Sequence, residues 1–569
     1  MTPLLRRFAR SRLTAPAIAI TAGALLLSSA ALAAPKPGAG RTVQLQLLTV
    51  SDWHGQLDPL SVGRPAVQIG GAAALSTYFQ QERAANPNTL TFTAGDAIGA
   101  SPPLANFFEE RPAIEAMNLM GFDADTLGNH NFDRGVDHLQ EMVDLADFPY
   151  VSANLRNRDA ELTGVKDFEI FTLDGVDVAV IGVTNPEAPT LVFPGSFGSI
   201  EVTDPVQAAQ KARATAKRAG ADVFVVLTHM GITGVDPATG AAFGPLIDFS
   251  NALGGFDVVV GDHTDFQYEG THNGALVVEN RSKGLTYART TLTVDPLRGQ
   301  VLAADATFVT PLTAAVAPDQ AVVDMLAPYR AQLQPILGRV VGSATKPILR
   351  SDSCGRGDGR LCESLVGNVV TDAMRLRYGT DFALTNSGGL RDALTCPTDG
   401  GGSGLCPPAP PADQITRGQV LSVLPFGNIA VTGTVTGAQL KTMLEHSVSS
   451  LPGANGRFAQ VSGLCFTYDI GAPVGSRVTS AVRPLATGEC TGTPVDLTAA
   501  GSYTLAQNDF TASGGDGYPN VTASIVSREV LDQVLADYVA AASPLSPTIQ
   551  GRITCTTSGA TACPVVTAP

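Results

Sequence analysis

The sequence lacks the features that mark several protein classes. Cysteine is absent before residue 354, and no two cysteines have the Cys-x-x-Cys spacing, which argues against a zinc site built from thiolates. After residue 34, no window approaches the ~20 consecutive apolar residues of a membrane-spanning helix, so we expect no membrane span. We find no internal repeat and no heptad array, which excludes solenoids and long coiled coils.

Positive charge is also scarce. The formal net charge is -15. Residues 1–34 contain four arginines and no acidic residue, so the rest of the chain is more negative still. A field of that sign repels polyanions, so we expect no nucleic-acid polymer among the partners. A small anionic ligand would need arginines placed close to it.

The first 34 residues have the pattern of an export signal. Four arginines between residues 6 and 12 lead into the apolar stretch 15–27, and Ala31-Leu-Ala33 offers a small-residue cleavage site. The residues after Arg6-Arg7 match a twin-arginine signal poorly. We expect a protein that is exported to the periplasm or the medium.

All eight cysteines lie in the second half of the chain. An even number with short gaps in an exported chain predicts disulfide bonds. We favour pairing in sequence order, while rearranged pairings stay open: Cys354 with Cys362, Cys396 with Cys406, Cys465 with Cys490, and Cys555 with Cys563.

The first half alternates strand-like and helix-like segments. This alternation predicts a layered α/β fold with ligands at the carboxyl ends of its strands. We expect strands at 43–50, 89–94, 176–183, 222–228 and 256–260, and helices at 70–85, 104–120 and 205–219.

A chain of 569 residues is too long for one hydrophobic core, so we expect two domains. Apolar residues on helical spacing over 319–341 predict a connecting helix, kinked or interrupted at Pro335. A second unit then opens with a helix at 365–375 and carries a Gly/Pro-rich surface loop at 399–411. The expected boundaries are 1–34 for the signal, 41–315 and 346–552 for the domains, 316–345 for the linker and 553–569 for a tail.

Metal-ligand side chains appear five times in the first half, at or soon after the end of an apolar segment. One such pair is weak evidence, because solvated acids and structural histidines are common. Five in order predict a shared centre for two divalent ions, with Asp96 as the bridging carboxylate. The proposed ligands are Asp52, His54, Asp96, Asn129, His229 and His263.

His130 follows the ligand Asn129 and has a different expected role. Asp133, three residues on, could hold its ring in one tautomer, and His130 would then donate a proton or hydrogen bond to a leaving oxygen. Three other histidines, at 138, 272 and 446, lack neighbours with metal-ligand spacing. We expect those three to be structural.

The second half carries polar residues on glycine-rich turns, in 385–391 and 508–517, and an aromatic residue in the turn at Phe426. Two aromatic rings can clamp a flat base, an arginine can bind phosphate, and an aspartate can accept from ribose hydroxyls. For either motif taken alone, we would favour the interpretation that Phe426 and Phe510 are core residues. Beside a metal centre, the nucleotide interpretation is favoured.

The ordered motifs Asp52-x-His54, Gly95-Asp96, Gly128-Asn-His-Asn-Phe-Asp133, Thr228-His229 and Gly261-x-His263-Thr resemble the calcineurin-like metallophosphoesterase domain. More closely, they resemble the 5′-nucleotidase family, which includes ecto-5′-nucleotidases and periplasmic UDP-sugar hydrolases. The resemblance implies a four-layered αββα domain with two zinc or manganese ions and a His130–Asp133 catalytic dyad. It also implies a linker helix and a C-terminal α+β nucleotide-binding domain.

The resemblance also assigns residues in the second half, with the base between Phe426 and Phe510. Asp516 would hold the ribose, Asn386 would contact the base, and Arg391 and Arg360 would face the phosphate and ribose, with Arg356 competing for the place of Arg360. One departure concerns Asp265, which stands where some family members use a glutamine as an extra metal ligand. A carboxylate ligand there would favour manganese over zinc.

The function expected from the resemblance is hydrolysis of nucleoside 5′-monophosphates to nucleoside and phosphate. UDP-sugar or nucleotide pyrophosphatase activity is one alternative. A 2′,3′-cyclic nucleotide phosphodiesterase with 3′-nucleotidase activity is another, since all would use the same metals. A nucleotide-binding protein without catalysis is a remote alternative, because no ligand or dyad residue is missing.

Overall fold

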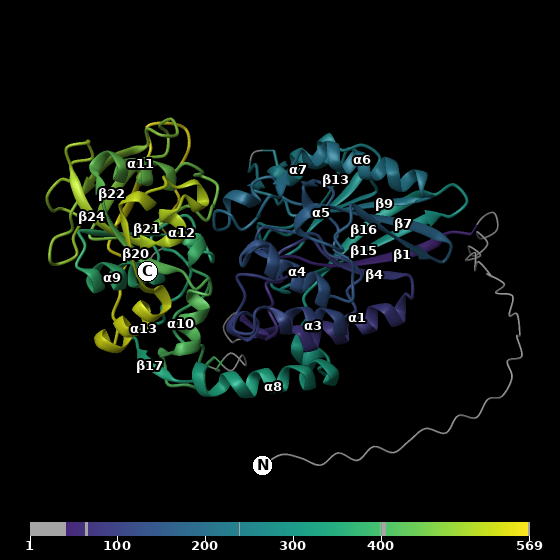
Figure 1. Cartoon of the computed structure of the whole chain (residues 1–569), viewed down its shortest axis with the longest axis horizontal. Helices are drawn as coiled ribbons and strands as arrows, with labels where there is room; N and C mark the ends of the chain where they lie inside the picture. Colours follow the sequence, from purple (N-terminus) through teal and green to yellow (C-terminus); the bar gives the residue numbers. More distant parts are fainter. Residues whose placement is uncertain (1–40, 63–66, 238, 399, 401–404, 567–569) are drawn as a thin grey trace, which may run out of the picture. The chain divides into compact units, whose positions relative to one another are not determined.

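The computed structural model describes residues 41–62, 67–237, 239–398, 400 and 405–566, and all of these fall in one compact unit (Figure 1). The expected signal at 1–34 lies outside the described residues, and so does part of the loop expected at 399–411. Among the residues described, every helix is too short or too polar to cross a membrane.

Two β-sheets form the centre of the first half. The four-stranded sheet has the order β16-β15-β1-β4, and the six-stranded sheet the order β13-β14-β12-β9-β7-β6. The first contains β1 (Val43–Val50), β4 (Thr89–Thr93), β15 (Tyr287–Asp295) and β16 (Gln300–Val309). The second contains β6 (Phe168–Leu173), β7 (Val176–Val183), β9 (Val223–Thr228), β12 (Val258–Val260), β13 (Tyr268–His272) and β14 (Ala275–Glu279).

Strand β1 shows how the sequence produces this packing. Side chains alternate between the two faces of a strand, and Leu45 and Leu47 enter the core between the sheets. Leu48 and Val50, on the opposite face, enter a second core shared with helices. Because both faces are covered, β1 is apolar over most of its length.

Helices cover the outer face of each sheet (Figure 1). The four-stranded sheet is covered by α1 (Ala72–Ala85), α3 (Arg111–Met120) and α4 (Gly135–Leu145). The six-stranded sheet is covered by α6 (Pro205–Arg218) and α7 (Pro245–Ala252). The order helix, sheet, sheet, helix confirms the predicted αββα architecture.

The helix expected at 104–120 is two helices, α2 (Pro103–Asn106) and α3. Glu109 and Glu110 lie between them with φ values of 55° and 64°. That left-handed backbone cannot continue an α-helix. The prediction of one helix was therefore wrong, and Pro112 in the first turn of α3 was the available signal.

Helix α8 (Gln320–Leu337) follows the first half, as predicted, and packs against α1 and α3. Its N-cap, Asp319, accepts a hydrogen bond from the backbone N–H of Ala321. Pro328 and Pro335 both lie inside the helix. The expected interruption at Pro335 is thus absent, since the helix runs two residues past it.

The second half is built on a five-stranded sheet with the order β21-β18-β24-β20-β25. One face packs against α11 (Gly437–Ser447), and the other against α9 (Leu365–Tyr378) and α13 (Leu531–Ala542). The strands are β18 (Phe382–Asn386), β20 (Ile429–Thr436), β21 (Ala459–Ser462), β24 (Ser502–Asn508) and β25 (Ile525–Val530). Smaller elements include β17 (Val340–Ser343), β19 (Gln414–Thr416), α10 (Arg417–Val423) and α12 (Asp509–Ala512).

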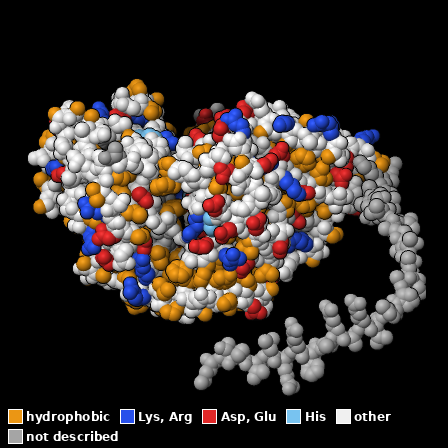
Figure 2. Space-filling view, viewed as in Figure 1, with side chains coloured by type: hydrophobic (Ala, Val, Ile, Leu, Met, Phe, Trp, Pro, Cys, Tyr) orange, Lys and Arg blue, Asp and Glu red, His pale blue; other side chains and the backbone are white. Residues whose placement is uncertain are grey.

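The cysteines pair in sequence order, which confirms the predicted connectivity. The segment after residue 552 begins with β26 (Ile553–Thr556), which pairs in parallel with β22 (Cys465–Asp469). β22 also pairs with β23 (Val478–Val482). On the face shown in Figure 2, lysine and arginine side chains are scattered among acidic and uncharged ones and form no continuous patch.

Candidate metal centre and nucleotide cavity

The predicted ligands of the first half meet where strands of both sheets end. Asp52 follows β1, Asp96 follows β4, His229 follows β9, and His263 follows β12. Asp52, Asp96 and His263 have φ values of 39°, 50° and 87°. The chain therefore turns as soon as it leaves each strand, and these side chains collect at one edge of the domain.

Three overlapping groups of side chains there could each hold an ion. Within each group, the ligand atoms lie within 4.8 Å of one another. His229 Nε2 is 2.9 Å from Asp96 Oδ2 and 3.1 Å from His263 Nδ1. The groups are Asp96, His229 and His263; Asp52, His229 and Asp262; and Asp52, His54 and Asp96.

The donor set fits divalent ions. The Nδ1 atoms of His54 and His229 pair with the carbonyl oxygens of Gly99 and Ala94 at 2.8 and 3.0 Å, which leaves each Nε2 for a metal. Asn129 is buried, and its Oδ1 has no hydrogen-bond partner among the described residues. Buried imidazole, carboxylate and amide donors are ligands for zinc or manganese.

Electrostatics at the cluster also favour a bound cation. Burial raises the pKa of Asp52 to about 6, because the charged carboxylate loses its hydration. Burial also lowers the pKa of His263 to about 3, helped by the neighbouring His229. Burial also acts to lower the pKa of His229, but the Asp96 carboxylate outweighs burial and raises that pKa to about 9. Divalent ions would supply positive charge to these buried carboxylates.

Asp265 does not join the cluster. Its carboxylate forms a two-pronged ion pair with Arg281, at 2.9 and 3.1 Å, and accepts hydrogen bonds from the backbone and hydroxyl of Ser282. The structure therefore does not support the expected role of Asp265 as a metal ligand. Its oxygens are already engaged by Arg281 and Ser282.

Asp262 was missed by the sequence reasoning. It is fully buried, and its carboxylate accepts hydrogen bonds from the backbone N–H groups of Asp52 and His263 at 3.1 and 2.8 Å. Burial, together with the nearby Asp52 carboxylate, holds the pKa of Asp262 well above its ordinary value. Only the fold brings Asp262 to Asp52, because 210 residues separate them.

Asn131 has a structural role that the sequence did not indicate. Its Oδ1 accepts hydrogen bonds from the backbone N–H groups of Asp96 and Gly128 at 3.1 and 2.8 Å. A Cβ atom at Gly128 would lie 2.2 Å from Asp96 Oδ1, so the motif requires glycine there. Together, Asn131 and Gly128 hold Asp96 at the centre of the cluster.

The expected dyad is formed. His130 Nδ1 lies 3.0 Å from both carboxylate oxygens of Asp133. Burial alone would lower the pKa of His130, but the Asp133 and Asp96 carboxylates outweigh it and raise that pKa. The backbone N–H of His130 donates to Asp96 Oδ1 at 2.7 Å, so the dyad is fixed to the cluster.

A cavity of about 1080 Å³ connects the dyad with residues of the second half. Its lining includes every substrate-binding residue expected from the sequence. The lining residues that matter here are Asn129, His130, Asp133, His263, Arg360, Asn386, Arg391, Phe426, Phe510 and Asp516.

Phe426 and Arg391 reach the reaction side of the cavity. The Phe426 ring lies nearly parallel to His130, with 5.7 Å between ring centroids and 20° between planes. The Arg391 guanidinium lies 5.7 Å from the Phe426 centroid, and its Nη2 is 3.5 Å from His54 Nε2. The aromatic residue and a cation thus flank the dyad and the metal ligands.

Asn386 and Asp516 form one polar unit. Asn386 Nδ2 donates to Asp516 Oδ2 at 2.7 Å, and Asn386 Oδ1 accepts from Asn508 Nδ2 at 3.0 Å. Phe510 lies over Gly515, where a Cβ atom would approach its ring to 2.3 Å. The glycine-rich turn therefore brings Phe510 and Asp516 into the same part of the cavity.

Arg356 and Arg360 both line the cavity but differ in their partners. Arg356 forms a two-pronged ion pair with Asp358 at 2.9 and 3.0 Å. Arg360 Nε is buried and has no hydrogen-bond partner among the described residues. The structure thus leaves Arg360, rather than Arg356, available to a ligand.

The layered fold and the buried Asp/His cluster define a hydrolase of the metallophosphoesterase type. The family model described as 5′-nucleotidase, C-terminal domain matches residues 340–523. A 5′-nucleotidase of Vibrio cholerae is 27% identical, over 89% of this chain and 92% of its own length. The crystal structure of a 5′-nucleotidase precursor from Thermus thermophilus has a TM-score of 0.79 at 26% identity, covering 90% of this chain and 99% of that one.

The chain is therefore similar to 5′-nucleotidases over about nine tenths of its length, and it is a hydrolase by class. Another relative, the endonuclease YhcR of Bacillus subtilis, is 27% identical over 90% of this chain. The chain spans only 41% of the length of that protein.

Proposed function

We propose that the protein hydrolyses nucleoside 5′-monophosphates to nucleoside and phosphate, using two divalent ions that are zinc or manganese. One observation carries the proposal. A single cavity is lined by the proposed metal ligands Asn129 and His263, the His130–Asp133 dyad, two aromatic rings and the Asn386–Asp516 pair. These are the groups needed for a phosphate ester, a base and a ribose.

The ions would be held by Asp52, His54, Asp96, Asn129, His229 and His263, with Asp262 completing the cluster. When bound, such ions lower the pKa of a water and neutralise the charge that develops on a phosphoryl group.

The protein's own residues position and protonate the substrate. Asp133 fixes the Nδ1–H of His130 and, with Asp96, favours the imidazolium, so Nε2–H can donate to the leaving 5′ oxygen. Arg391 and Arg360 bind the phosphoryl and ribose side. Holding the reacting groups together in this way lowers the entropic part of the barrier.

Recognition of the nucleoside is assigned to Phe426 and Phe510 for the base, to Asp516 for the ribose hydroxyls and to Asn386 for the base edge. Stacking on aromatic rings tolerates any base, because every base has a π face. The Asn386–Asp516 hydrogen bond orients the carboxylate that accepts from the ribose.

Phosphate release from AMP, UDP-glucose and 2′,3′-cyclic AMP by the purified, metal-loaded protein tests the proposal. We expect AMP to be turned over with the highest kcat/KM, and a His130→Ala variant to lose most of that activity while keeping its metal content. Preference for UDP-glucose or the cyclic nucleotide would replace this substrate assignment. No turnover by the wild type, and no effect of the substitution, would favour the non-catalytic alternative.

We also propose that the protein is exported and has domains at 41–315 and 346–552 joined by the linker 316–345. Four disulfide bonds support an oxidising compartment. Hydrophobic cores drawn from only the first or only the second half support the two domains.

A further inference from the structure

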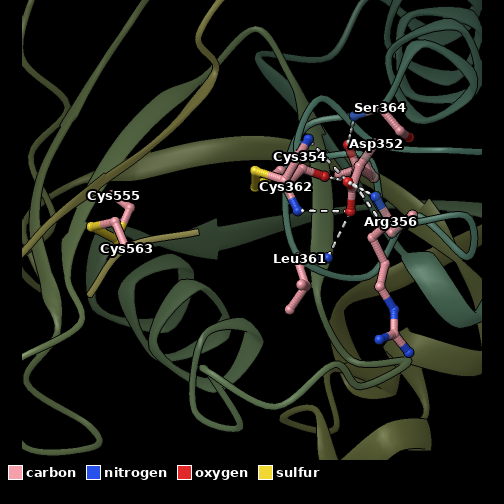
Figure 3. The surroundings of a disulfide bond; sticks show 10 residues. Asp352, Cys354, Arg356, Leu361, Cys362, Ser364, Cys555 and Cys563 are labelled. Atoms are coloured by element: carbon pink, nitrogen blue, oxygen red, sulfur yellow. Dashed lines mark hydrogen bonds between the residues drawn. A yellow bond between two sulfur atoms is a disulfide. The ribbon is translucent and has the colours of Figure 1, made fainter. Parts of the chain in front are cut away.

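A short loop closed by a disulfide presents charge to the cavity. It runs from Asp352 to Ser364 and is bridged by Cys354–Cys362 (Figure 3). The Asp352 carboxylate accepts hydrogen bonds of 3.0–3.1 Å from four backbone N–H groups of the loop. The donors are those of Cys354, Arg356, Leu361 and Cys362.

The loop is fixed twice, by a covalent bridge and by a buried carboxylate. Figure 3 shows the Arg356 side chain extending away from the disulfide. Arg356, Asp358 and Arg360 all line the cavity. A rigid loop holds these three charged side chains at fixed positions in the wall of the cavity.

The three charges are not equivalent. Asp358 holds Arg356 through two parallel hydrogen bonds of 2.9 and 3.0 Å, the strongest geometry for such a pair. Arg360 has a buried Nε without a partner in the described part of the chain. The loop therefore offers one cation with an unused hydrogen-bond donor, Arg360, and one cation held in an ion pair, Arg356.

The position of Arg360 relates this loop to the substrate path. Arg360 lines the same cavity as His263 on the reaction side and Asp516 on the ribose side. A phosphoryl group bound there would meet Arg360 and also the carboxylate of Asp358, which lines the same cavity and interacts with Arg360 as well.

We propose that Asp358 determines how many phosphoryl groups the cavity accepts. By occupying Arg356, it leaves Arg360 as the free cation of the loop, and its carboxylate repels additional negative charge. The site therefore favours nucleotides with one phosphoryl group over those with two or three. This inference rests on the proposed nucleotide function and assigns its preference for monophosphates to one residue.

The test is an Asp358→Asn variant, which cannot neutralise Arg356. We expect its kcat/KM ratio for ADP over AMP to rise about tenfold relative to wild type, because Arg356 becomes free to make a charge-assisted hydrogen bond. We also expect the ratio of Kd values for methylenediphosphonate and phosphate, measured by calorimetry, to shift towards the diphosphonate by a similar factor.

Further variants separate the causes. An Arg356→Ala/Asp358→Asn double variant restores the net charge of the native pair and should return both ratios to near the wild-type values. Arg356→Ala alone removes the ion-pair partner of Asp358, adds net negative charge to the cavity wall and should lower the ADP to AMP ratio below that of the wild type. Glu529→Gln, which breaks an ion pair with Arg377 outside the cavity, should change neither ratio.

Unchanged ratios in Asp358→Asn would overturn the inference, and so would a double variant as permissive as the single one. If Asp358→Asn does not fold, Arg356→Ala decides by the direction of its shift. Absence of nucleotide hydrolysis by the wild type would sink the proposed function alone, because the phosphate and diphosphonate affinities still report on Asp358.

Discussion

Replacing Asp133 by asparagine should slow hydrolysis without loosening metal binding. Both Asp133 oxygens lie 3.0 Å from His130 Nδ1, and one of them also accepts from the backbone N–H of Ala100 at 3.1 Å. Asparagine keeps one acceptor oxygen but loses the charge that favours the imidazolium. The fold should tolerate the change, because Asp133 is partly exposed at the cavity and retains an acceptor.

The magnitude follows from the hydrogen bond that is weakened. A hydrogen bond to a charged group contributes about 1.5–3 kcal/mol, and each ~1.4 kcal/mol changes a rate tenfold. We therefore expect kcat for AMP to fall roughly 10- to 150-fold. His130→Ala should cost about 10²–10⁴-fold, the usual range for a general acid.

Steady-state phosphate release gives kcat and KM, while elemental analysis and thermal melting report metal content and folding. A His130→Ala/Asp133→Asn double variant should be no slower than His130→Ala alone, because the effects of residues that act as a unit are not additive. The dyad would be refuted by Asp133→Asn retaining more than half of the wild-type kcat with normal metal content, or by losses that multiply in the double variant.

Other changes have equally definite expectations. Phe426→Ala should raise KM for AMP about tenfold or more, since a stacked base contributes ~1–3 kcal/mol. The same variant should hydrolyse p-nitrophenyl phosphate, which has no base, within a factor of two of the wild-type rate. An equal loss on both esters would show that Phe426 does not bind the base. Asp352→Asn should lower the free energy of unfolding by about 2–4 kcal/mol, because the NH2 group of the new asparagine would face backbone N–H donors that lose their acceptor. Chemical denaturation measures this change, and an unchanged midpoint would contradict the expectation. Asp265→Asn should leave metal stoichiometry unchanged, as its partner is Arg281, so loss of an ion would restore Asp265 as a ligand. EDTA should abolish activity, and zinc or manganese should restore it; full activity after verified metal removal would exclude the metal proposal.

Local sequence patterns predicted the elements that carry the centre. Strand β1 and strand β7 have the predicted bounds, because alternation and continuous apolar runs determine a buried strand directly. The α2–α3 break was not predicted, since its cause is the left-handed backbone of Glu109 and Glu110. Nothing in the identity of two glutamates specifies that conformation.

The candidate site shows the same division between local and long-range information. Asp52, Asp96 and His229 could be found because each comes within three residues of the end of a strand. Asp262 could not, because its importance depends on the approach of Asp52 from a distant segment. Asp265 looked like a ligand because the sequence did not reveal its pairing with Arg281, which the fold brings alongside it.

Two of the three ligand groups contain residues from both central sheets. Asp52 and Asp96 belong to the ends of the four-stranded sheet, whereas His229, Asp262 and His263 follow strands of the six-stranded sheet. An ion held by either group would clasp the two sheets together at one edge of their shared core. Bound metal would then stabilise the contact between the two sheets in addition to its chemical role. The apoprotein should open first along this edge when it unfolds.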